Sequence, residues 1–337
     1  MSRFHVAIVG ATGLVGQEFI RVLEQRRFPM DSIRLLASDR SVGRKLSVNN
    51  ENVGVEETTA DSFKGIDIAL FSAGADISHR FSPLAVKSGA VVVDNSSAFR
   101  MEPHVPLVVP EVNPEDIEGH KGIIANPNCS TIQMVVALYP LHKVDPIRRL
   151  TVATYQAVSG TGTPAVEELN VQSRIVLEGG EAIPKVYPCQ IAFNVLPEID
   201  VFLDNGYTKE EWKMAEETRK IIHVPDLAIS ATCVRVPVYT GHSEAVQVEF
   251  SQPMSVEEAK HILAQAPGVE VMDDPSARLY PYPTMAEGRD EVFVGRIRED
   301  ASHPNGLALW IVSDNLRKGA ALNAVQIAEE AIRRGVV

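Results

Sequence analysis

The sequence contains few cysteines and no long apolar run. Only three of its 337 residues are cysteine, and Cys129, Cys189 and Cys233 lack the C-x-x-C spacing of zinc sites. Three is also an odd number that suggests no disulfide framework, so we expect no metal site and a reducing compartment. No apolar stretch approaches the length of a membrane-spanning helix, and the N-terminus shows no leader pattern. We therefore expect a cytoplasmic protein without a membrane partner.

The sequence also has fewer basic than acidic residues. The chain has 32 Lys and Arg against 44 Asp and Glu, which gives a net charge of −12. This balance argues against broad binding of nucleic acids or anionic membranes, so any anionic ligand must meet local positive charge. The length allows two domains that each bury a core.

The first part of the chain alternates apolar strands with amphipathic helices, which is typical of a doubly wound α/β domain. A glycine-rich junction joins the strand 4–9 to the helix that follows. Its glycines permit a tight turn, close approach to a pyrophosphate and close packing of helix on strand. The spacing is G-x-x-G-x-x-G, and plain turn glycines are the alternative, but the flanking strand and helix favour a dinucleotide site. The candidate cofactor residues here are Gly10, Thr12, Gly13, Leu14, Val15 and Gly16.

A second strand, 33–37, ends where such a domain contacts the adenosine ribose. Asp39 can accept hydrogen bonds from a 2′-hydroxyl group, whereas the serines and arginines around it can hold a 2′-phosphate. We favour NADP, and a solvated basic turn is the alternative. The candidate 2′-phosphate residues are Ser38, Arg40 and Ser41, with Arg44 and Lys45 close behind.

Further candidates follow later strands of this domain. Ser72 and Gly74 come after the strand 66–71, at a carboxyl end where a cofactor can approach. Arg100 follows the strand 90–94 on the ligand-facing edge, and an ordinary surface arginine is the alternative. Asn315 precedes a last helix that we expect to pack on the first domain, which would place Asn315 near the cofactor.

Cys129 lies where a short apolar strand, 122–125, passes into a helix. At a helix N-terminus the unpaired amides and the helix dipole favour an anion, which raises the thiolate fraction near neutral pH. Cys129 is therefore the candidate nucleophile. The alternative is a small buried core residue, because cysteine is among the most buried residue types.

After Cys129 the pattern changes to β-rich segments separated by helices and by a long irregular connection, 178–197. This pattern predicts an open mixed or antiparallel sheet with helices on one face, a common oligomerisation surface. The expected fold class is α/β, with a Rossmann-like dinucleotide-binding domain plus an α+β catalytic and dimerisation domain. The first domain covers 1–128 and is completed by a C-terminal helix, 316–337, and the second covers 129–315.

Several motifs make the chain resemble the aspartate-β-semialdehyde dehydrogenases along essentially its whole length. Each motif alone could occur on another fold, but their order and spacing together are specific. The resemblance implies NADPH-dependent reduction of L-aspartyl-4-phosphate to L-aspartate-4-semialdehyde and phosphate, in lysine or diaminopimelate, threonine and methionine biosynthesis, by a homodimer or homotetramer. The motifs are Gly10–Gly16, Asn126–Thr131, Tyr155–Gly160, Cys233–Pro237 with Gly241–Ser243, and Ser313–Gly319.

The resemblance also implies catalytic roles. Cys129 forms a thioacyl intermediate, His242 is the general acid/base, and Gln156 is an orienting amide beside the thiol. An aldehyde donates hydride only after a nucleophile adds to it, so the chemistry requires a nucleophile and proton management. Without this context, His242 would more often be a surface histidine.

Other residues are implied to bind ligands. Arg235 alternates with valines along its strand, so its guanidinium can project into a cleft and bind the substrate carboxylate. Glu217 and Lys220 share a helix face, where a surface salt pair is the alternative. By resemblance Glu217 receives the substrate ammonium and Lys220 the phosphate. The remaining implied contacts are Arg100 to phosphate, Asn128 to substrate or phosphate, and Ser159, Gly160 and Asn315 to the cofactor.

Two alternatives stay open. N-acetyl-γ-glutamyl-phosphate reductase shares the architecture and the acyl-phosphate chemistry, but its acetylated substrate offers no ammonium to Glu217. A nucleotide-binding paralogue that has lost catalysis is the other. The presence of Cys129, Gln156, Arg235 and His242 together argues against that paralogue.

Overall fold

The computed structural model describes residues 3–337, which form two compact units. Of the described residues, 3–128 and 320–337 form unit 1, and 129–319 form unit 2. Each unit is built on its own β-sheet with helices packed against it, so the predicted α/β fold class is confirmed. Within residues 3–337, no helix combines the length and the apolar character that crossing a membrane requires.

Unit 1 contains a twisted sheet with the strand order β3-β4-β2-β1-β5-β6-β7. All neighbouring pairs are parallel except β3 with β4, which is antiparallel. The carboxyl ends of the parallel strands therefore share one edge, where ligands bind in this type of sheet. The strands are β1 (Phe4–Val9), β2 (Met30–Ala37), β3 (Lys45–Val48), β4 (Glu51–Glu57), β5 (Ile68–Phe71), β6 (Val91–Asp94) and β7 (Ile123–Ala125).

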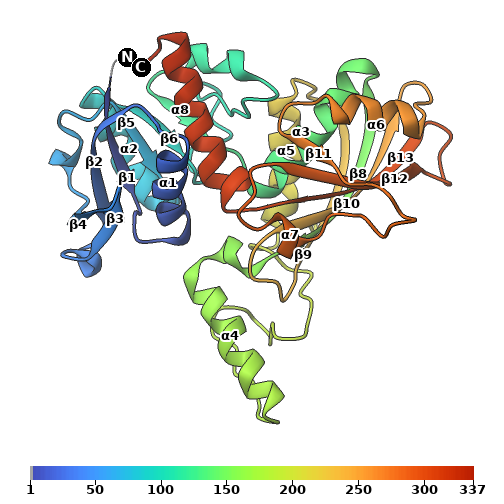
Figure 1. The fold of residues 1–337 in the computed structure, drawn as a ribbon, viewed down its shortest axis with the longest axis horizontal. Helices are drawn as coiled ribbons and strands as arrows, with labels where there is room; N and C mark the ends of the chain where they lie inside the picture. Colours follow the sequence, from blue (N-terminus) through green and yellow to red (C-terminus); the bar gives the residue numbers. More distant parts are fainter. Residues whose placement is uncertain (1–2) are drawn as a thin grey trace. The chain divides into compact units, whose positions relative to one another are not determined.

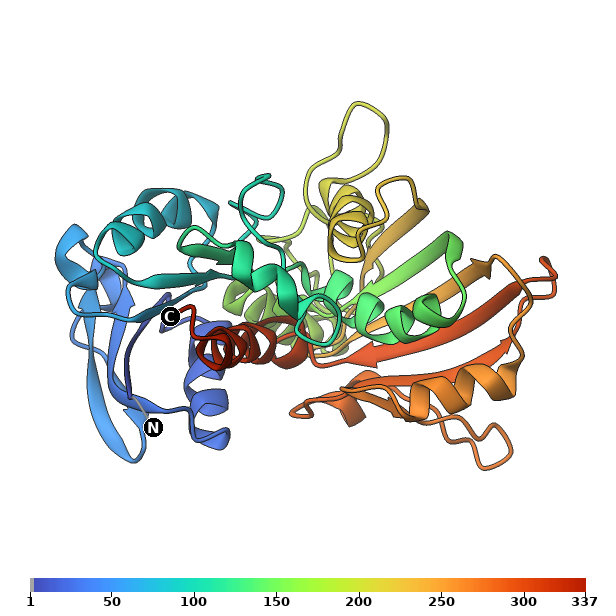
Figure 2. The same cartoon turned by 90° about the horizontal axis from the view of Figure 1, so that it is seen from above.

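Helices cover both faces of this sheet because its central strands are apolar on both sides. Val6 and Ile8 of β1 face the cluster formed with α1 (Leu14–Gln25) and α8 (Leu322–Arg334). The alternate residues of β1 face α2 (Ala75–Lys87) on the other side. Figures 1 and 2 both show α8 alongside α1, so the last helix of the chain completes the N-terminal unit.

The hairpin of β3 and β4 is an element that the sequence pattern did not predict. Leu46 and Val48 on β3, and Val53 and Val55 on β4, alternate with exposed residues and pack against the core of unit 1, but the two alternating stretches are short. The turn residues Asn49 and Asn50 have φ angles of 49° and 66°. Asparagine tolerates this left-handed region in two-residue hairpin turns, and the Asn-Asn pair was the available signal.

Unit 2 contains a mixed sheet with the strand order β11-β12-β13-β10-β8-β9. The two outermost pairs are parallel and the inner pairs are antiparallel. A mixed sheet was among the predicted arrangements, although the short β11 and α7 were not predicted. The strands are β8 (Ile147–Gln156), β9 (Ala228–Arg235), β10 (His242–Phe250), β11 (Val269–Val271), β12 (Val292–Glu299) and β13 (Gly306–Ser313).

One face of this second sheet is covered by helices (Figure 1). Along β10, Val246 and Val248 are fully buried, whereas Ala245 and Gln247 on the other face are half-buried. Figure 1 also shows α4 and the irregular segment after it standing apart from the sheet. The helices of unit 2 are α3 (Cys129–Val144), α4 (Thr163–Leu177), α5 (Lys209–Ile221), α6 (Val256–Ala264) and α7 (Pro283–Ala286).

A π-helical turn, Arg317–Ala321, precedes α8. The sequence pattern predicted an uninterrupted helix from residue 316 and a domain boundary before it, whereas unit 2 ends at Gly319. Single π-turns are rare and are often found at functional sites. This turn contains the end of unit 2 and the start of the final segment of unit 1.

We predict that Gly16→Ala destabilises unit 1. A Cβ atom at Gly16 would lie 2.1 Å from the Gly10 carbonyl oxygen and 2.7 Å from the Ala11 Cα atom, which are backbone atoms that cannot rotate away. Overpacking of this kind lowers the free energy of unfolding by about 1–3 kcal/mol. Urea unfolding would measure the loss. Gly54→Ala is the matched control, because no atom lies within 4 Å of its added Cβ, and equal stability of the two variants would contradict the prediction.

Candidate active site

A cavity of about 470 Å³ opens at the carboxyl edge of the unit 1 sheet. Gly10 and Gly13 line it at the end of β1, and Gly13 is the N-cap of α1, so no capping side chain covers the first amides of the helix. Unpaired amides at a helix N-terminus bind phosphate groups. Gly10 has φ +89°, and a Cβ there would lie 2.2 Å from the Ser72 carbonyl oxygen, so the loop requires glycine at this position.

The cavity includes some of the residues predicted to bind the cofactor and excludes others. Gly16 packs under Gly10 and Val15 packs against the core, so both have structural roles. Ser41 lies just outside the lining, where its Oγ is 3.4 Å from the Thr12 Oγ1. The predicted residues that line the cavity are Gly10, Thr12, Gly13, Ser38, Arg40 and Ser72, and those that do not are Leu14, Val15, Gly16, Ser41 and Gly74.

Sequence reasoning missed several cavity residues because they lie on elements whose roles were not recognised. Glu57 ends the unpredicted β4 and Thr58 follows it, and Ile77, Arg80 and Phe81 belong to α2. Arg80 places a second guanidinium on the cavity wall together with Arg40. Two carboxylates, Asp39 and Glu57, line the cavity as well, so the positive charge that an anionic ligand needs is local to the two arginines.

Arg100 is buried and held by backbone carbonyls of unit 1. Its Nε donates to the Asn126 carbonyl oxygen and its Nη2 to the Asn95 carbonyl oxygen, both at 2.9 Å. These contacts fix the direction of the guanidinium, so Arg100 is not an ordinary surface arginine. Burial raises the pKa of the nearby Asp94, although the serine donors around it and Arg100 oppose this effect.

Cys129 is the first residue of α3 and is partly exposed, unlike the fully buried Cys233. One helical turn later, Gln133 accepts a 2.7 Å hydrogen bond from the Ser313 hydroxyl group, and Ser313 pairs with His242 across β13 and β10. Residues four apart share a helix face, so Cys129 lies on the face of α3 that meets the His242 end of β10. A Cβ at Gly319 would lie 2.9 Å from the Cys129 Cβ, so the π-turn packs directly against the cysteine.

The backbone of Ala157 links His242 and Arg235. The Ala157 N–H donates to the His242 Nδ1 at 3.0 Å, and the Arg235 Nη1 donates to the Ala157 carbonyl oxygen at 2.7 Å. Gly160 lies over both side chains, since a Cβ there would be 3.1 Å from the Arg235 Nη1 and 3.3 Å from the His242 Nε2. Burial lowers the pKa of His242 well below its ordinary value of 6.5, and Arg235 lowers it further.

Two buried side-chain donors beside Ala157 have no acceptor within residues 3–337. They are the Arg235 Nε and the His242 Nε2. Leaving a buried polar group unpaired costs about 1–3 kcal/mol, which a ligand with carboxylate or carbonyl oxygens would recover. The pair therefore marks a site for such a ligand.

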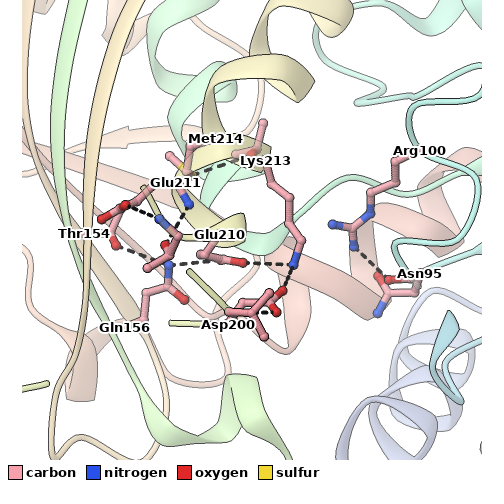
Figure 3. Close-up of polar contacts among 12 residues, drawn as sticks. Asn95, Arg100, Thr154, Gln156, Asp200, Glu210, Glu211, Lys213 and Met214 are labelled. Carbon is pink, nitrogen blue, oxygen red and sulfur yellow. Dashed lines mark hydrogen bonds and ion pairs between the residues drawn. The ribbon is translucent and has the colours of Figure 1, made fainter. Parts of the chain in front are cut away.

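Gln156, at the end of β8, is oriented by a chain of charged residues that sequence reasoning missed (Figure 3). Its Nε2 donates to the Glu210 Oε1 at 3.2 Å, and the Glu210 Oε2 lies 3.3 Å from the Lys213 Nζ. Lys213 also contacts Asp200 at 2.7 Å. Burial raises the pKa of Asp200, but the Lys213 ammonium outweighs it and leaves the pKa below its ordinary value.

The remaining predicted site residues are Glu217, Lys220, Asn315 and Asn128. Glu217 is 1% exposed on α5, so the surface salt pair is not its environment, and Lys220 is half-buried on the same helix. Asn315 accepts from the Gly241 N–H at 2.8 Å and donates to the Ser159 hydroxyl at 2.9 Å. Asn315 thus holds the loops that carry Ser159 and His242. Asn128, the last residue of the first segment of unit 1, is buried.

None of the three cysteines, all in the described part of the chain, forms a disulfide bond. Burial raises the pKa of the Cys233 thiol, and nearby carboxylates such as Glu210 raise it further, so Cys233 is an inert core residue. Across residues 3–337, no cluster of three or more His, Cys, Asp or Glu side chains is arranged to hold a metal ion.

Two protein-family models match the chain. One, described as the NAD binding domain of semialdehyde dehydrogenase, matches residues 5–120, and the other, described as the semialdehyde dehydrogenase dimerisation domain, matches residues 138–318. The chain is 57% identical over 339 residues to the aspartate-semialdehyde dehydrogenase of Aquifex aeolicus, and 53% identical over 341 residues to that of Bacillus subtilis. Each alignment covers 99% of both chains.

Solved structures agree with these matches. The crystal structure of aspartate semialdehyde dehydrogenase II complexed with ASA from Vibrio cholerae has a TM-score of 0.97 and 48% identity, with 99% of each chain covered. Aspartate semialdehyde dehydrogenase with NADP from Candida albicans has a TM-score of 0.78 and 29% identity, with all of each chain covered.

Glu244 is a further buried acid that sequence reasoning missed. It is fully buried on β10, and its carboxylate oxygens have no hydrogen-bond partner within the described residues. Burial raises its pKa well above the ordinary value of 4.5, and the nearby Gln133 amide opposes this only in part. Above pH 4.5 the unfolded chain has released a proton that the folded protein keeps. The free energy of unfolding therefore falls as the pH rises through this window.

We predict that Glu244→Gln removes this pH dependence, because the amide has nearly the shape of the protonated acid and cannot ionise. The variant should gain stability over the parent as the pH rises above 4.5, by up to about 1.4 kcal/mol per pH unit. Urea unfolding at several pH values would measure the difference. Glu299→Gln, on an exposed carboxylate, is the control and should show a constant difference. If the difference in the free energy of unfolding between Glu244→Gln and the parent stays constant with pH, Glu244 is not neutral in the folded protein.

Proposed function

This chain belongs to the aspartate-semialdehyde dehydrogenase family and is an oxidoreductase, and we propose that it reduces L-aspartyl-4-phosphate to L-aspartate-4-semialdehyde and phosphate with NADPH. The observation that carries this proposal is the pair of buried donors, Arg235 Nε and His242 Nε2, on the face of the sheet against which α3 and its leading Cys129 pack. The reaction serves the biosynthesis of lysine or diaminopimelate, threonine and methionine, in the cytoplasm.

The chain's own residues supply the covalent chemistry. The Cys129 thiolate displaces phosphate from the acyl carbon and forms a thioester. His242 manages the proton at the substrate oxygen, as a general acid/base, and Gln156 orients the reacting groups beside the thiol. Arg235 binds the α-carboxylate through its Nε edge, since its Nη1 is already committed to Ala157. Glu217 receives the ammonium, while Lys220, Arg100 and Asn128 hold phosphate or substrate.

The cavity of unit 1 suits the cofactor by its chemistry. Helix N-terminal amides meet the pyrophosphate, and Arg40 meets the 2′-phosphate, with Arg80 on the same wall. When bound, NADPH supplies the hydride that reduces the thioester. Ser159, Gly160 and Asn315 complete the proposed cofactor contacts. A relative from Candida albicans is named as an aspartate semialdehyde dehydrogenase with NADP, which supports the choice of cofactor.

We also propose self-association as a homodimer or homotetramer. The uncovered face of the unit 2 sheet carries Tyr155, which is 38% exposed, with its ring centroid 5.4 Å from that of Trp310. Aromatic side chains of this kind are enriched in protein–protein interfaces. The match to a dimerisation domain over residues 138–318 supports the same assignment.

We predict that Cys129→Ala abolishes phosphate-dependent NADP reduction with aspartate semialdehyde, to below about a thousandth of the parental rate, because no thioester can form. NADP binding should persist, since the proposed cavity belongs to unit 1. Cys189→Ala, at an exposed thiol, is the control and should keep full activity. N-acetylglutamate semialdehyde, tested in parallel, should give little turnover. Undiminished turnover by Cys129→Ala, or a preference for the acetylated substrate, would refute the proposal.

A second prediction concerns the choice of cofactor. Arg40→Ala should reduce the preference for NADPH over NADH by about 10–100-fold, because one charged hydrogen bond to the 2′-phosphate is worth about 1.5–3 kcal/mol. The ratio of kcat/KM for the two cofactors measures the effect. Arg44→Ala removes an exposed arginine outside the cavity and should leave the ratio unchanged. If both variants keep the parental ratio, Arg40 does not bind a 2′-phosphate.

A further inference from the structure

The segment 163–196 leaves the sheet of unit 2 and returns to it at the same place, the Arg235 end of β9. We call this segment the arm; it consists of α4 and the irregular chain that follows. Just before the arm, Gly160 packs against Arg235, since a Cβ there would lie 3.1 Å from the Nη1 atom. At the end of the arm, Leu196 and Arg235 exchange backbone hydrogen bonds of 2.9 and 2.8 Å. Both ends of the arm are therefore attached around Arg235.

The returning chain of the arm is held to α4 through its backbone. The Glu168 carboxylate is 7% exposed and accepts hydrogen bonds from the N–H groups of three consecutive residues, 185–187. One helical turn later, the Gln172 Oε1 accepts from the N–H groups of residues 191–192, at 2.9 and 3.2 Å. Backbone hydrogen bonds to a carboxylate are among the strong ones. These contacts fix the path of the returning chain and hence the position of Tyr187.

Tyr187 extends from this chain to the turn that contains Gly160. Its hydroxyl group donates a 3.1 Å hydrogen bond to the Oγ1 of Thr161, the residue after Gly160. Its ring packs against the apolar cluster that α4 and the returning chain form together. Burial raises the pKa of the phenol, and the positive charge of Arg235 opposes this effect. The phenol is therefore protonated near neutral pH and lies close enough to the guanidinium to feel its charge.

We propose that Tyr187 is a positioning residue for the substrate's α-carboxylate, because its hydrogen bond to Thr161 closes the arm over Arg235. The inference rests on the proposed function, in which the Arg235 guanidinium binds that carboxylate, and it extends the substrate site to the arm. Arg235 is 5% exposed, and an ion pair is stronger where water is excluded, since the effective dielectric constant is lower. The Tyr187 hydroxyl ties the returning chain to the turn beside the guanidinium. Loss of this tie admits water to Arg235 and weakens its hold on the carboxylate.

Tyr187→Phe removes the hydroxyl group and keeps the ring. In phosphate-dependent NADP reduction, we expect its KM for aspartate semialdehyde to rise about 3–10-fold, as for the loss of one neutral hydrogen bond, with kcat within about twofold of the parent. The value of kcat/KM for 3-aminopropanal, which is the substrate without its α-carboxylate, should not change. Tyr207→Phe, at an exposed tyrosine of the same unit, is the control and should change neither value. A parental KM for aspartate semialdehyde, or equal losses with the two aldehydes, would overturn the role of Tyr187.

A double-mutant cycle tests the contact itself. Thr161→Val removes the acceptor oxygen with little change of shape, so it should raise the KM for aspartate semialdehyde by a factor similar to that of Tyr187→Phe. The double variant should have no higher KM than either single variant, because both substitutions break the same hydrogen bond. Effects that multiply would show that the hydroxyl does not act through Thr161 and would overturn the proposal. Absence of turnover by the unmodified protein refutes the proposed function as well, whereas the other contrary outcomes refute only the role of Tyr187.

Discussion

The candidate active site depends on the backbone of Ala157, because both of its polar groups are engaged by side chains. Its N–H meets the ring of His242 and its carbonyl meets the guanidinium of Arg235. The two groups belong to consecutive peptide planes that meet at the Ala157 Cα atom, so the conformation of one residue sets the positions of two side chains. The Arg235 Nε and the His242 Nε2 remain without a partner among residues 3–337, and Gly160 packs against the Nη1 of the first side chain and the Nε2 of the second.

The polar groups around this peptide are arranged by the cost of burial. Gln156 is paired with Glu210, whose second oxygen is paired with Lys213, so the buried charges compensate one another. Such networks orient a side chain more firmly than packing alone, because each member has few alternative partners. Glu244 is the exception, since its carboxyl oxygens lie under the same sheet without a hydrogen-bond partner among residues 3–337, and burial keeps the group neutral. The burial of Glu244 without a partner therefore lowers the free energy of unfolding as the pH rises.

Local patterns predicted most of the elements correctly. The strand 4–9, the glycine junction after it and the helix that begins at Cys129 were all expected from apolar runs and glycine spacing, and each is present in the structure. The failures have physical causes. The β3–β4 hairpin has only two short stretches of apolar alternation, and the π-turn before α8, which packs against Cys129, corresponds to no local pattern. Arg80 was missed because an arginine on an amphipathic helix gives no sign of the cavity it faces.

The sequence by itself determined the α/β class, the nucleotide-binding junction and the identity of the candidate nucleophile, because periodicity, glycine spacing and helix termini are local properties. It also indicated that Arg235 and His242 act together, through the resemblance of its motifs. Only the tertiary structure decided how they act. The contact between Ala157 and His242 joins residues 85 positions apart, and Glu210, which accepts a hydrogen bond from Gln156, lies on α5, 54 positions away. Hydrogen-bond partners so distant in the chain are set by the pairing of strands and the packing of helices, which no local pattern records.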